Sequence, residues 1–419
     1  MPEQGRIIDL FAGAGGWEEG LMAHGLHATG VELDQAACRT AVAAGHERIV
    51  ADVAALEPAS FGDVWGLIAS PPCQAYSLAG RGLGRRDQPH VVACAHELAA
   101  GHDTRAARRA RCEDDRSLLT VEPLRWALTL RPRWIALEQV PPVMELWSLF
   151  AELLAAHGYE TAVGVLSAER YGVAQTRKRA YLIASLDGPV RLPAPTHRFY
   201  DPRRPQHVRD DERHLPSWVS MADALGWTAD AVVRTQRPTH DGRDPQGLTR
   251  ATDCPSFTVL SSTRAWTVEP CAPRGTSGPN ARTRRPVGYD SRQTGCRVRP
   301  TAEPAPTLLA SGLAKGTPTW VFRRPATTVL GDRRVQPPGH KRNARDRAGR
   351  YQTRAGKQAV RVTVEQATRL QGFRPDYPWQ GSPTAQFRQI GNAVCPPLVR
   401  LVLGEAMRSS QPDAGATDA

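Results

Sequence analysis

The first half of the chain alternates between short apolar runs and longer stretches with helical periodicity. The apolar runs are four to eight residues long and are followed by turn-forming residues, which is typical of buried strands. They occupy residues 6–11, 27–32, 49–52, 63–68, 133–138, 159–166 and 179–185. Helical periodicity occupies residues 17–24, 34–44, 117–130 and 144–157. This order predicts an α/β fold with a mostly parallel sheet and helices on both of its faces.

The pattern changes in the second half of the chain. Residues 195–360 are rich in proline, arginine, glycine and threonine and contain short strand-like pieces, which predicts a smaller β-rich, loop-heavy domain. Helical signals then return: Thr363 and Gln366 fit a capping box, and a final apolar helix is expected to pack back on the first domain. The predicted organisation is therefore residues 1–190, 195–360 and 361–408, followed by a polar tail, 409–419, that is expected to be disordered.

The net charge of +12 is unevenly distributed over the 419 residues. Residues 195–360 hold 29 Lys and Arg against 14 Asp and Glu, whereas the rest of the chain has a net charge of −3. A basic region of this size favours a polyanion-binding surface, with nucleic acid as the first expectation; a merely solvated arginine-rich segment is the alternative. No apolar run approaches the ~20 residues that span a bilayer, and no signal-peptide pattern is present, so a cytosolic protein is expected.

The eight cysteines show no paired spacing and are expected to be free thiols. Residues 78–116 are interpreted as an exposed loop with an arginine-rich insertion at 81–112. This insertion also holds two cysteines and two histidines, but their spacing fits no standard zinc pattern, so no metal is expected. The four side chains in question are Cys94, His96, His102 and Cys112.

A glycine-rich turn joins the first strand to the first helix. This turn, Ala12–Gly16, would let the backbone approach a ligand at the N-terminus of the helix. Three successive strands are interpreted as ending in a carboxylate, at Asp9, Glu32 and Asp52. Acids at single strand ends are often turn formers or caps, but three in a row favour a site for a cofactor with a nucleoside and a positive centre.

Cys73 follows a buried strand directly. Pro71 and Pro72 end that strand, because each lacks an N–H and fixes φ, and they present the cysteine on a stiff turn. Strand ends are where ligand crevices form in open α/β sheets, so Cys73 is a candidate nucleophile; a buried, inert cysteine is the alternative. Glu138 ends another strand at the same predicted edge and is the candidate proton partner.

Six motifs, in this order, resemble those of the DNA (cytosine-5-)-methyltransferase family. The resemblance covers about residues 1–190 and 360–407, with a variable region between them. The motifs are Asp9-Leu-Phe-Ala-Gly-Ala-Gly-Gly16, Pro71-Pro-Cys-Gln74, Glu138-Gln-Val140, Gln175-Thr-Arg-Lys-Arg179, Arg369-Leu-Gln-Gly-Phe373 and Gln389-Ile-Gly-Asn-Ala-Val394.

The resemblance implies a Rossmann-like, S-adenosylmethionine-dependent methyltransferase fold, with residues 195–360 as the target-recognition domain. It implies that Cys73 attacks C6 of a cytosine flipped out of double-stranded DNA and that Glu138 holds N3 and the exocyclic amine. Arg177 and Arg179 correspond to the arginines that support the flipped base, and Gln74, Ser77 and Arg116 are the implied substrate-binding residues. The implied cofactor-binding residues are Phe11, Ala12, Gly13, Gly15, Gly16, Glu32, Asp52, Val53, Pro71, Asn392 and Val394.

Two departures from the family pattern are present. Gln139 stands where the family usually has asparagine, which puts catalytic efficiency in question, and the loop after Cys73 is longer than is common, with Arg116 at its expected far end. Two alternatives stay open: a tRNA cytosine-5 methyltransferase and a non-catalytic DNA-binding relative. The expected partners are double-stranded DNA and a cognate restriction endonuclease acting on the same site. A monomer is expected, without membrane association, in the cytoplasm and near the nucleoid of a prokaryote.

Overall fold

A computed structural model places most of the chain outside the basic region. The residues that it describes leave gaps in the turn after the fourth strand and in the region between residues 226 and 363. The structure describes residues 5–72, 76, 83–201, 204, 207–226, 231–236, 265–270, 298–300, 305–306, 319–322 and 363–410.

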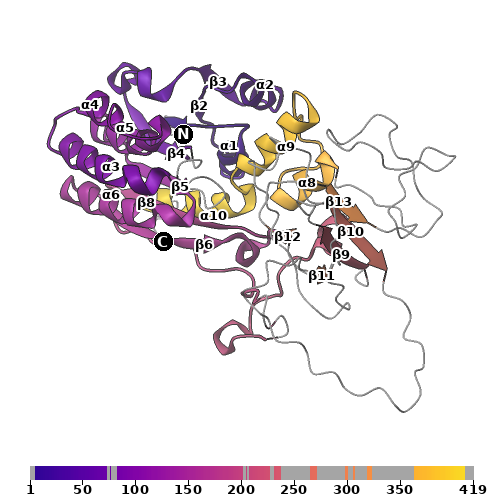
Figure 1. Cartoon of the computed structure of the whole chain (residues 1–419). Coiled ribbons are helices and arrows are strands. Elements are labelled where there is room, and N and C mark those ends of the chain that lie inside the picture. Colours follow the sequence, from indigo (N-terminus) through magenta and orange to yellow (C-terminus); the bar gives the residue numbers. More distant parts are fainter. Residues whose placement is uncertain are drawn as a thin grey trace, which may run out of the picture.

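A seven-stranded sheet with the order β3-β2-β1-β4-β5-β8-β6 forms the centre of the fold (Figure 1). The first five strands in this order are parallel, and β8 is antiparallel to both of its neighbours. This confirms the predicted mostly parallel α/β sheet. The strands are β1 Arg6–Leu10, β2 Thr29–Glu32, β3 Glu47–Val50, β4 Val64–Ala69, β5 Trp134–Gln139, β6 Glu160–Ser167 and β8 Lys178–Ser185.

Helices cover both faces of this sheet because the strands are apolar on both sides. Ile8 and its neighbours on one face pack against α3 (Leu83–Ala99), α5 (Glu122–Leu130) and α6 (Met144–Ala156). Ile7 and its neighbours on the opposite face pack against α1 (Gly16–Met22) and α10 (Pro396–Met407). The final apolar helix therefore returns to the N-terminal part of the chain, as Figure 1 shows by the yellow ribbon beside the indigo one.

The other C-terminal helices continue this return. α8 (Val364–Gln371) and α9 (Pro383–Asn392) pack with Ala14 of the glycine turn in a second apolar cluster. Thr363 and Gln366 form the predicted capping box. At the other end of the chain, Asp34 caps α2 (Gln35–Ala43), as its position before the helical pattern indicates.

A smaller, four-stranded sheet lies within the basic region. It has the order β11-β9-β10-β13 and lies apart from the large sheet in Figure 1. A two-residue strand of the same region, β12, pairs with β7, which precedes β8. The bounds are β7 Gln175–Thr176, β9 Ala231–Gln236, β10 Ala265–Pro270, β11 Val298–Pro300, β12 Ala305–Pro306 and β13 Thr319–Phe322.

The prediction of an exposed loop at residues 78–116 is wrong for most of that segment. α3 is a helix of 17 residues, and α4 (Arg105–Arg109) follows it. Val91, Cys94 and Ala95 lie on one helical face and are completely buried against the sheet. The helix forms because this face joins the core, although Pro89 and the many polar residues count against a helix on propensity alone.

One helix boundary also differs from expectation. The helix predicted at residues 117–130 begins as a 3₁₀ helix, η3 (Asp115–Val121), and continues as α5.

None of the helices among the described residues combines the length and hydrophobicity that a bilayer crossing requires.

Candidate active site

The carboxyl ends of β1, β2, β4 and β5 meet at one edge of the sheet, because these strands are parallel. The turn after β1 reverses the chain sharply: Phe11 and Gly13 have φ values of 58° and 57°, and Gly15 has a φ of 108°. A positive φ at phenylalanine is unusual and is characteristic of tight functional turns. The turn therefore lies at the edge where the strands end.

Glu32, at the end of β2, holds this turn. Its Oε2 accepts a hydrogen bond from the backbone N–H of Gly13 at 2.9 Å, and its Oε1 accepts from Leu33 and Asp34 at 2.7 Å each. The carboxylate thus joins the glycine turn to the end of the neighbouring strand. The same turn is also held from the C-terminal segment, because the Tyr377 hydroxyl donates to the carbonyl of Ala14.

The glycines of the turn have different surroundings. A Cβ added at Gly13 would meet no atom within 4 Å, so open space lies over this residue. At Gly15 a Cβ would lie 2.5 Å from the Tyr377 hydroxyl, and at Gly16 it would lie 2.8 Å from Val394 Cγ2. Gly13 therefore leaves room for a ligand, whereas Gly15 and Gly16 allow the C-terminal segment to pack closely.

Two of the acids predicted at strand ends, Asp52 and Asp9, have different positions in the structure. Asp52 lies two residues beyond β3 and caps the 3₁₀ helix η1 (Val53–Ala55) by accepting from the N–H of Ala54 at 3.0 Å. Asp9, by contrast, lies inside β1 and is completely buried, so its assignment to the strand edge is wrong. β1 continues for one residue beyond Asp9 because Leu10 still pairs with its neighbours in β2 and β4.

Asp9 instead belongs to a buried charged cluster beneath the glycine turn. Burial, followed by repulsion from Glu18, raises the pKa of Asp9 well above its usual range. Arg48, in β3, forms an ion pair with Glu18, and both side chains are almost completely buried. The Arg48 guanidinium also donates to the carbonyl of Gly13, with N–O distances of 3.3 and 3.4 Å. This cluster therefore supports the turn from below.

The turn after β4 is held on two sides. The Trp17 indole donates to the Ser70 hydroxyl at 2.9 Å, and the Gln139 amide donates to the carbonyl of Pro71 at 2.6 Å. The Gln139 amide oxygen also accepts from the N–H of Val140 at 2.7 Å. The chain is thus fixed up to the residues that precede Cys73. The remaining predicted residues of this turn, Cys73, Gln74 and Ser77, lie outside the described residues.

Glu138 and Arg179, both predicted as catalytic residues, are in contact at this edge of the sheet. Glu138 is only 5% exposed at the end of β5, and its Oε1 lies 2.9 Å from Nε of Arg179 in β8. Arg177 is buried nearby and donates to the carbonyl of Gly391 at 3.1 Å. Burial, followed by repulsion from Arg179, lowers the pKa of Arg177 to about 10. The structure thus brings together three of the four predicted catalytic residues.

Predicted residues from the C-terminal segment lie at the same edge or next to it. Val394 is buried over Gly16, whereas Asn392 ends α9 and is exposed. Gln175, which precedes the arginines, donates from its buried amide to Leu370 O at 3.1 Å and to Gln371 Oε1 at 2.8 Å. These contacts connect the arginine-bearing segment to α8.

Arg116 is half exposed and forms an ion pair with Asp114 at 2.7 Å. Other arginines of the insertion are paired in the same way, with Asp103, Glu97 and Glu113 as partners. The segment is therefore less strongly positive than its arginine content indicates. Within the described ranges, no group of three or more His, Cys, Asp and Glu side chains could hold a metal ion.

For the activity that the sequence resemblance implies, Gln139→Leu is expected to lower the single-turnover rate about tenfold, because it leaves the buried Pro71 carbonyl, two residues before Cys73, without this donor. Gln139→Asn, which restores the usual family residue, is expected to retain more activity than the leucine variant. Gln88→Leu is the matched control, because it removes an exposed hydrogen bond to Glu145 on another part of the surface. Equal rates for Gln139→Leu and the wild type would contradict a positioning role for Gln139.

The sequence did not predict the side chains that bind the site segments from remote positions in the chain. Trp17, Arg48 and Tyr377 each contact a predicted site segment, and none lies in the part of a motif that carries chemistry. Trp17 directly follows the glycine turn, and this position was the one feature of the sequence that could have indicated a role in supporting the site. Arg48 and Tyr377 are distant in sequence from their partners, and no spacing rule connects them.

Comparisons with known proteins agree with this arrangement. The sequence pattern of the family described as C-5 cytosine-specific DNA methylase matches residues 5–98 and 100–408. The chain is 25% identical over 459 residues to the type II methyltransferase M.AgeI of Thalassovita gelatinovora, covering 96% of this chain and 99% of that protein. It is 24% identical over 420 residues to the type II methyltransferase M1.HphI of Haemophilus parahaemolyticus, covering 96% and 86%.

The fold is similar to that of solved methyltransferases. The Dnmt2 methyltransferase of S. pombe aligns with a TM-score of 0.53 and 13% identity, covering 98% of this chain and 100% of that chain. The family pattern spans nearly the whole chain and includes both ends of the site described above. The chain therefore belongs to the C-5 cytosine-specific DNA methylase family and is a DNA cytosine-5 methyltransferase.

Proposed function

We propose that this protein transfers a methyl group from S-adenosylmethionine to C5 of a cytosine flipped out of double-stranded DNA, through a covalent bond between Cys73 and C6. The observation that carries the proposal is the pairing of buried Glu138 with Arg179 at the strand edge where the Pro71 turn leads into Cys73. A buried carboxyl beside a fixed arginine suits a group that must recognise the polar edge of a base.

The chain's own residues fit S-adenosylmethionine. Open space over Gly13 leaves room for a ligand before the N-terminal end of α1, and the Glu32 carboxylate beside it can accept hydrogen bonds from ribose hydroxyls. Leu33, which follows Glu32, is 64% exposed and offers an apolar surface for a base. When bound, the cofactor supplies the electrophilic methyl group. The residues proposed to hold it are Phe11, Ala12, Gly13, Gly15, Gly16, Glu32, Asp52, Val53, Pro71, Asn392 and Val394.

Side chains of the protein are proposed to carry out the remaining steps. The thiolate of Cys73 adds to C6, which makes C5 nucleophilic and moves negative charge toward N3 of the ring. Glu138 holds N3 and the exocyclic amine, and Arg179 fixes the Glu138 carboxyl in this position. Arg177 and Arg179 provide positive charge beside the adduct. Once C5 carries the methyl group, a base removes the C5 proton and the thiolate leaves.

Binding of DNA is assigned to the basic region and to the turn after Cys73. Residues 195–360, with 29 Lys and Arg against 14 Asp and Glu, are proposed as the target-recognition domain. Gln74, Ser77 and Arg116 are proposed to contact the substrate beside the flipped base. We propose that the protein acts as a monomer, with residues 1–190 and 361–408 as the catalytic part, and that a cognate restriction endonuclease cleaves the same site.

Covalent trapping tests this function. Duplex DNA in which 5-fluorodeoxycytidine replaces deoxycytidine is expected to form a denaturant-stable complex with the protein in the presence of S-adenosylmethionine, because the fluorine at C5 cannot leave as a proton does. No complex is expected without the cofactor. Trapping on tRNA that contains 5-fluorocytidine, with none on DNA, would contradict the DNA substrate. The absence of trapping on both would contradict the covalent route.

A further inference from the structure

The turn formed by η1 is held by two arginines from different helices. Arg125 of α5 donates to the carbonyls of Val53 and Leu56, at 3.1 and 2.9 Å. Arg105 of α4 donates to the carbonyl of Ala54 at 3.1 Å. Three carbonyls within residues 53–56 are therefore bound by arginines, and this turn cannot shift without losing a charge-assisted hydrogen bond.

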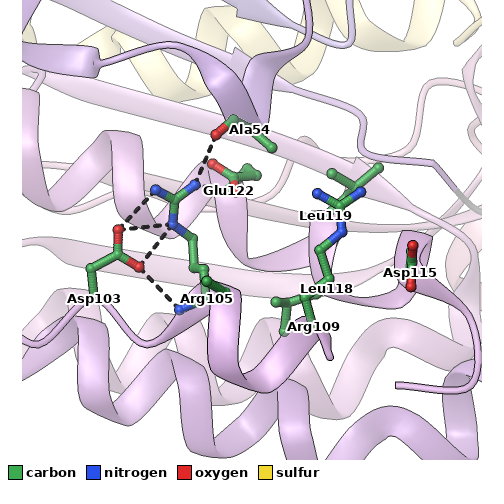
Figure 2. A pocket seen from close by; sticks show the side chains of 9 residues that line it. Ala54, Asp103, Arg105, Arg109, Asp115, Leu118, Leu119 and Glu122 are labelled. Atoms are coloured by element: carbon green, nitrogen blue, oxygen red, sulfur yellow. Dashed lines mark hydrogen bonds and ion pairs between the residues drawn. The ribbon is translucent and has the colours of Figure 1, made fainter. Parts of the chain in front are cut away.

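One buried carboxylate orients both arginines. Glu122 is 3% exposed; its Oε1 accepts from Arg105 at 2.8 Å and its Oε2 accepts from Arg125 at 2.8 Å. Asp103 binds the opposite side of the Arg105 guanidinium, as Figure 2 shows. We call Glu122, Arg105 and Arg125 the Glu122 clamp. Its charges are balanced when Asp103 is included, so the clamp is stable in a mostly buried position.

The clamp borders a cavity of about 360 Å³ beside η1. Figure 2 shows the Arg105 side chain reaching from α4 across this cavity toward Ala54. No residue of α4 is buried, so this short helix is attached by polar contacts and not by apolar packing. Arg105 can therefore be altered with little loss of core packing, while the η1 turn loses one of its donors.

We propose that Arg105 is a positioning residue for cofactor binding: through Glu122 and the Ala54 carbonyl it fixes the turn that carries Asp52 and Val53. The segment between the Cys73 turn and α5 then contributes to cofactor affinity without touching the cofactor. This inference rests on the proposed function, in which Asp52 and Val53 line the S-adenosylmethionine site. It adds Arg105, which the sequence motifs do not include.

Arg105→Met tests the inference in the full-length protein. The dissociation constant of S-adenosylmethionine, measured by isothermal titration calorimetry, is expected to rise about tenfold, the usual scale for losing a charge-assisted hydrogen bond. The KM for the cofactor is expected to rise in parallel, while kcat at saturating cofactor stays within about twofold. Arg105→Lys keeps the positive charge but has one nitrogen in place of the three that Arg105 uses, and is expected to give an intermediate affinity.

Arg108→Met is the matched control, because Arg108 lies on the same short helix, pairs with Glu97 and makes no contact with η1. This variant is expected to bind the cofactor as the wild type does, and binding is measured well below the melting temperature of every variant. Wild-type affinity in Arg105→Met, or an equal loss in Arg105→Met and Arg108→Met, would overturn the inference and leave the proposed function intact. A wild-type protein that does not bind S-adenosylmethionine would overturn both.

Discussion

Cys73→Ser is expected to abolish methyl transfer while leaving affinity for DNA within about threefold of the wild type. A serine hydroxyl is scarcely ionised near neutral pH, whereas a thiol can form the thiolate that attacks the ring. Loss of a catalytic nucleophile typically costs at least about 10⁴-fold in rate. Transfer of labelled methyl groups to genomic DNA, together with gel-shift titration, measures both quantities.

Cys112→Ser is the control for this substitution. Its thiol is partly buried on the insertion and donates to the carbonyl of Arg108, and Cys112 is not among the proposed site residues. The Cys112 variant is expected to keep full activity and to form the 5-fluorocytosine adduct, and the Cys73 variant is expected to form none. Methylation by Cys73→Ser at a rate near that of the wild type would rule out the covalent route through this residue.

Arg48→Met is expected to destabilise the protein by about 3–5 kcal/mol, the usual cost of removing one partner of a buried ion pair. The Glu18 carboxylate would lose its counter-charge, and the Gly13 carbonyl would lose its donor. This loss is a large part of the ~5–15 kcal/mol that stabilises a typical folded domain. Equilibrium unfolding in urea, followed by circular dichroism, measures the change.

The penalty for Arg48→Met is expected to depend on pH. The pKa of Asp9 is raised above its usual 3.8 in the folded protein, so between these two values the folded state holds a proton that the unfolded state has lost. The contribution of Asp9 to the free energy of unfolding therefore falls as pH rises from 3.8 to the raised pKa. Loss of the Arg48 charge raises the pKa of Asp9 further and so widens this pH range. The penalty should therefore be larger at the alkaline end of this range than at its acid end. Arg39→Met, an exposed arginine on α2, is the control and should change stability little at either pH.

The sequence predicted those features that depend on local pattern. Apolar runs marked the strands, the Asp34 and Thr363 caps marked helix starts, and the order of six motifs indicated the family. α3 was missed because its buried face contains only small residues such as Cys94 and Ala95, among many polar ones. Tertiary contact with the sheet decides the conformation there, and no local rule reports such a contact.

The candidate site was predicted only in part, because some of its contacts also depend on the tertiary structure. Glu138 and Arg179 were assigned from motifs, and they are in contact. Asp9 was misplaced because the end of a strand in sequence is uncertain by one or two residues, enough to move a side chain from the edge to the interior. The supports at Arg48, Arg125 and Tyr377 depend on partners far away in the chain, and only coordinates reveal them.

The position of α10 has a consequence for synthesis of the chain. This helix covers a face of the sheet whose strands end at Ser185, and its Val399, Val402 and Leu403 are completely buried there. At roughly 5–20 residues per second, a ribosome needs on the order of 10–45 s to travel from β8 to the end of α10. During this interval the part of this apolar face that α10 covers is open, and the nascent chain is most exposed to aggregation and to chaperones.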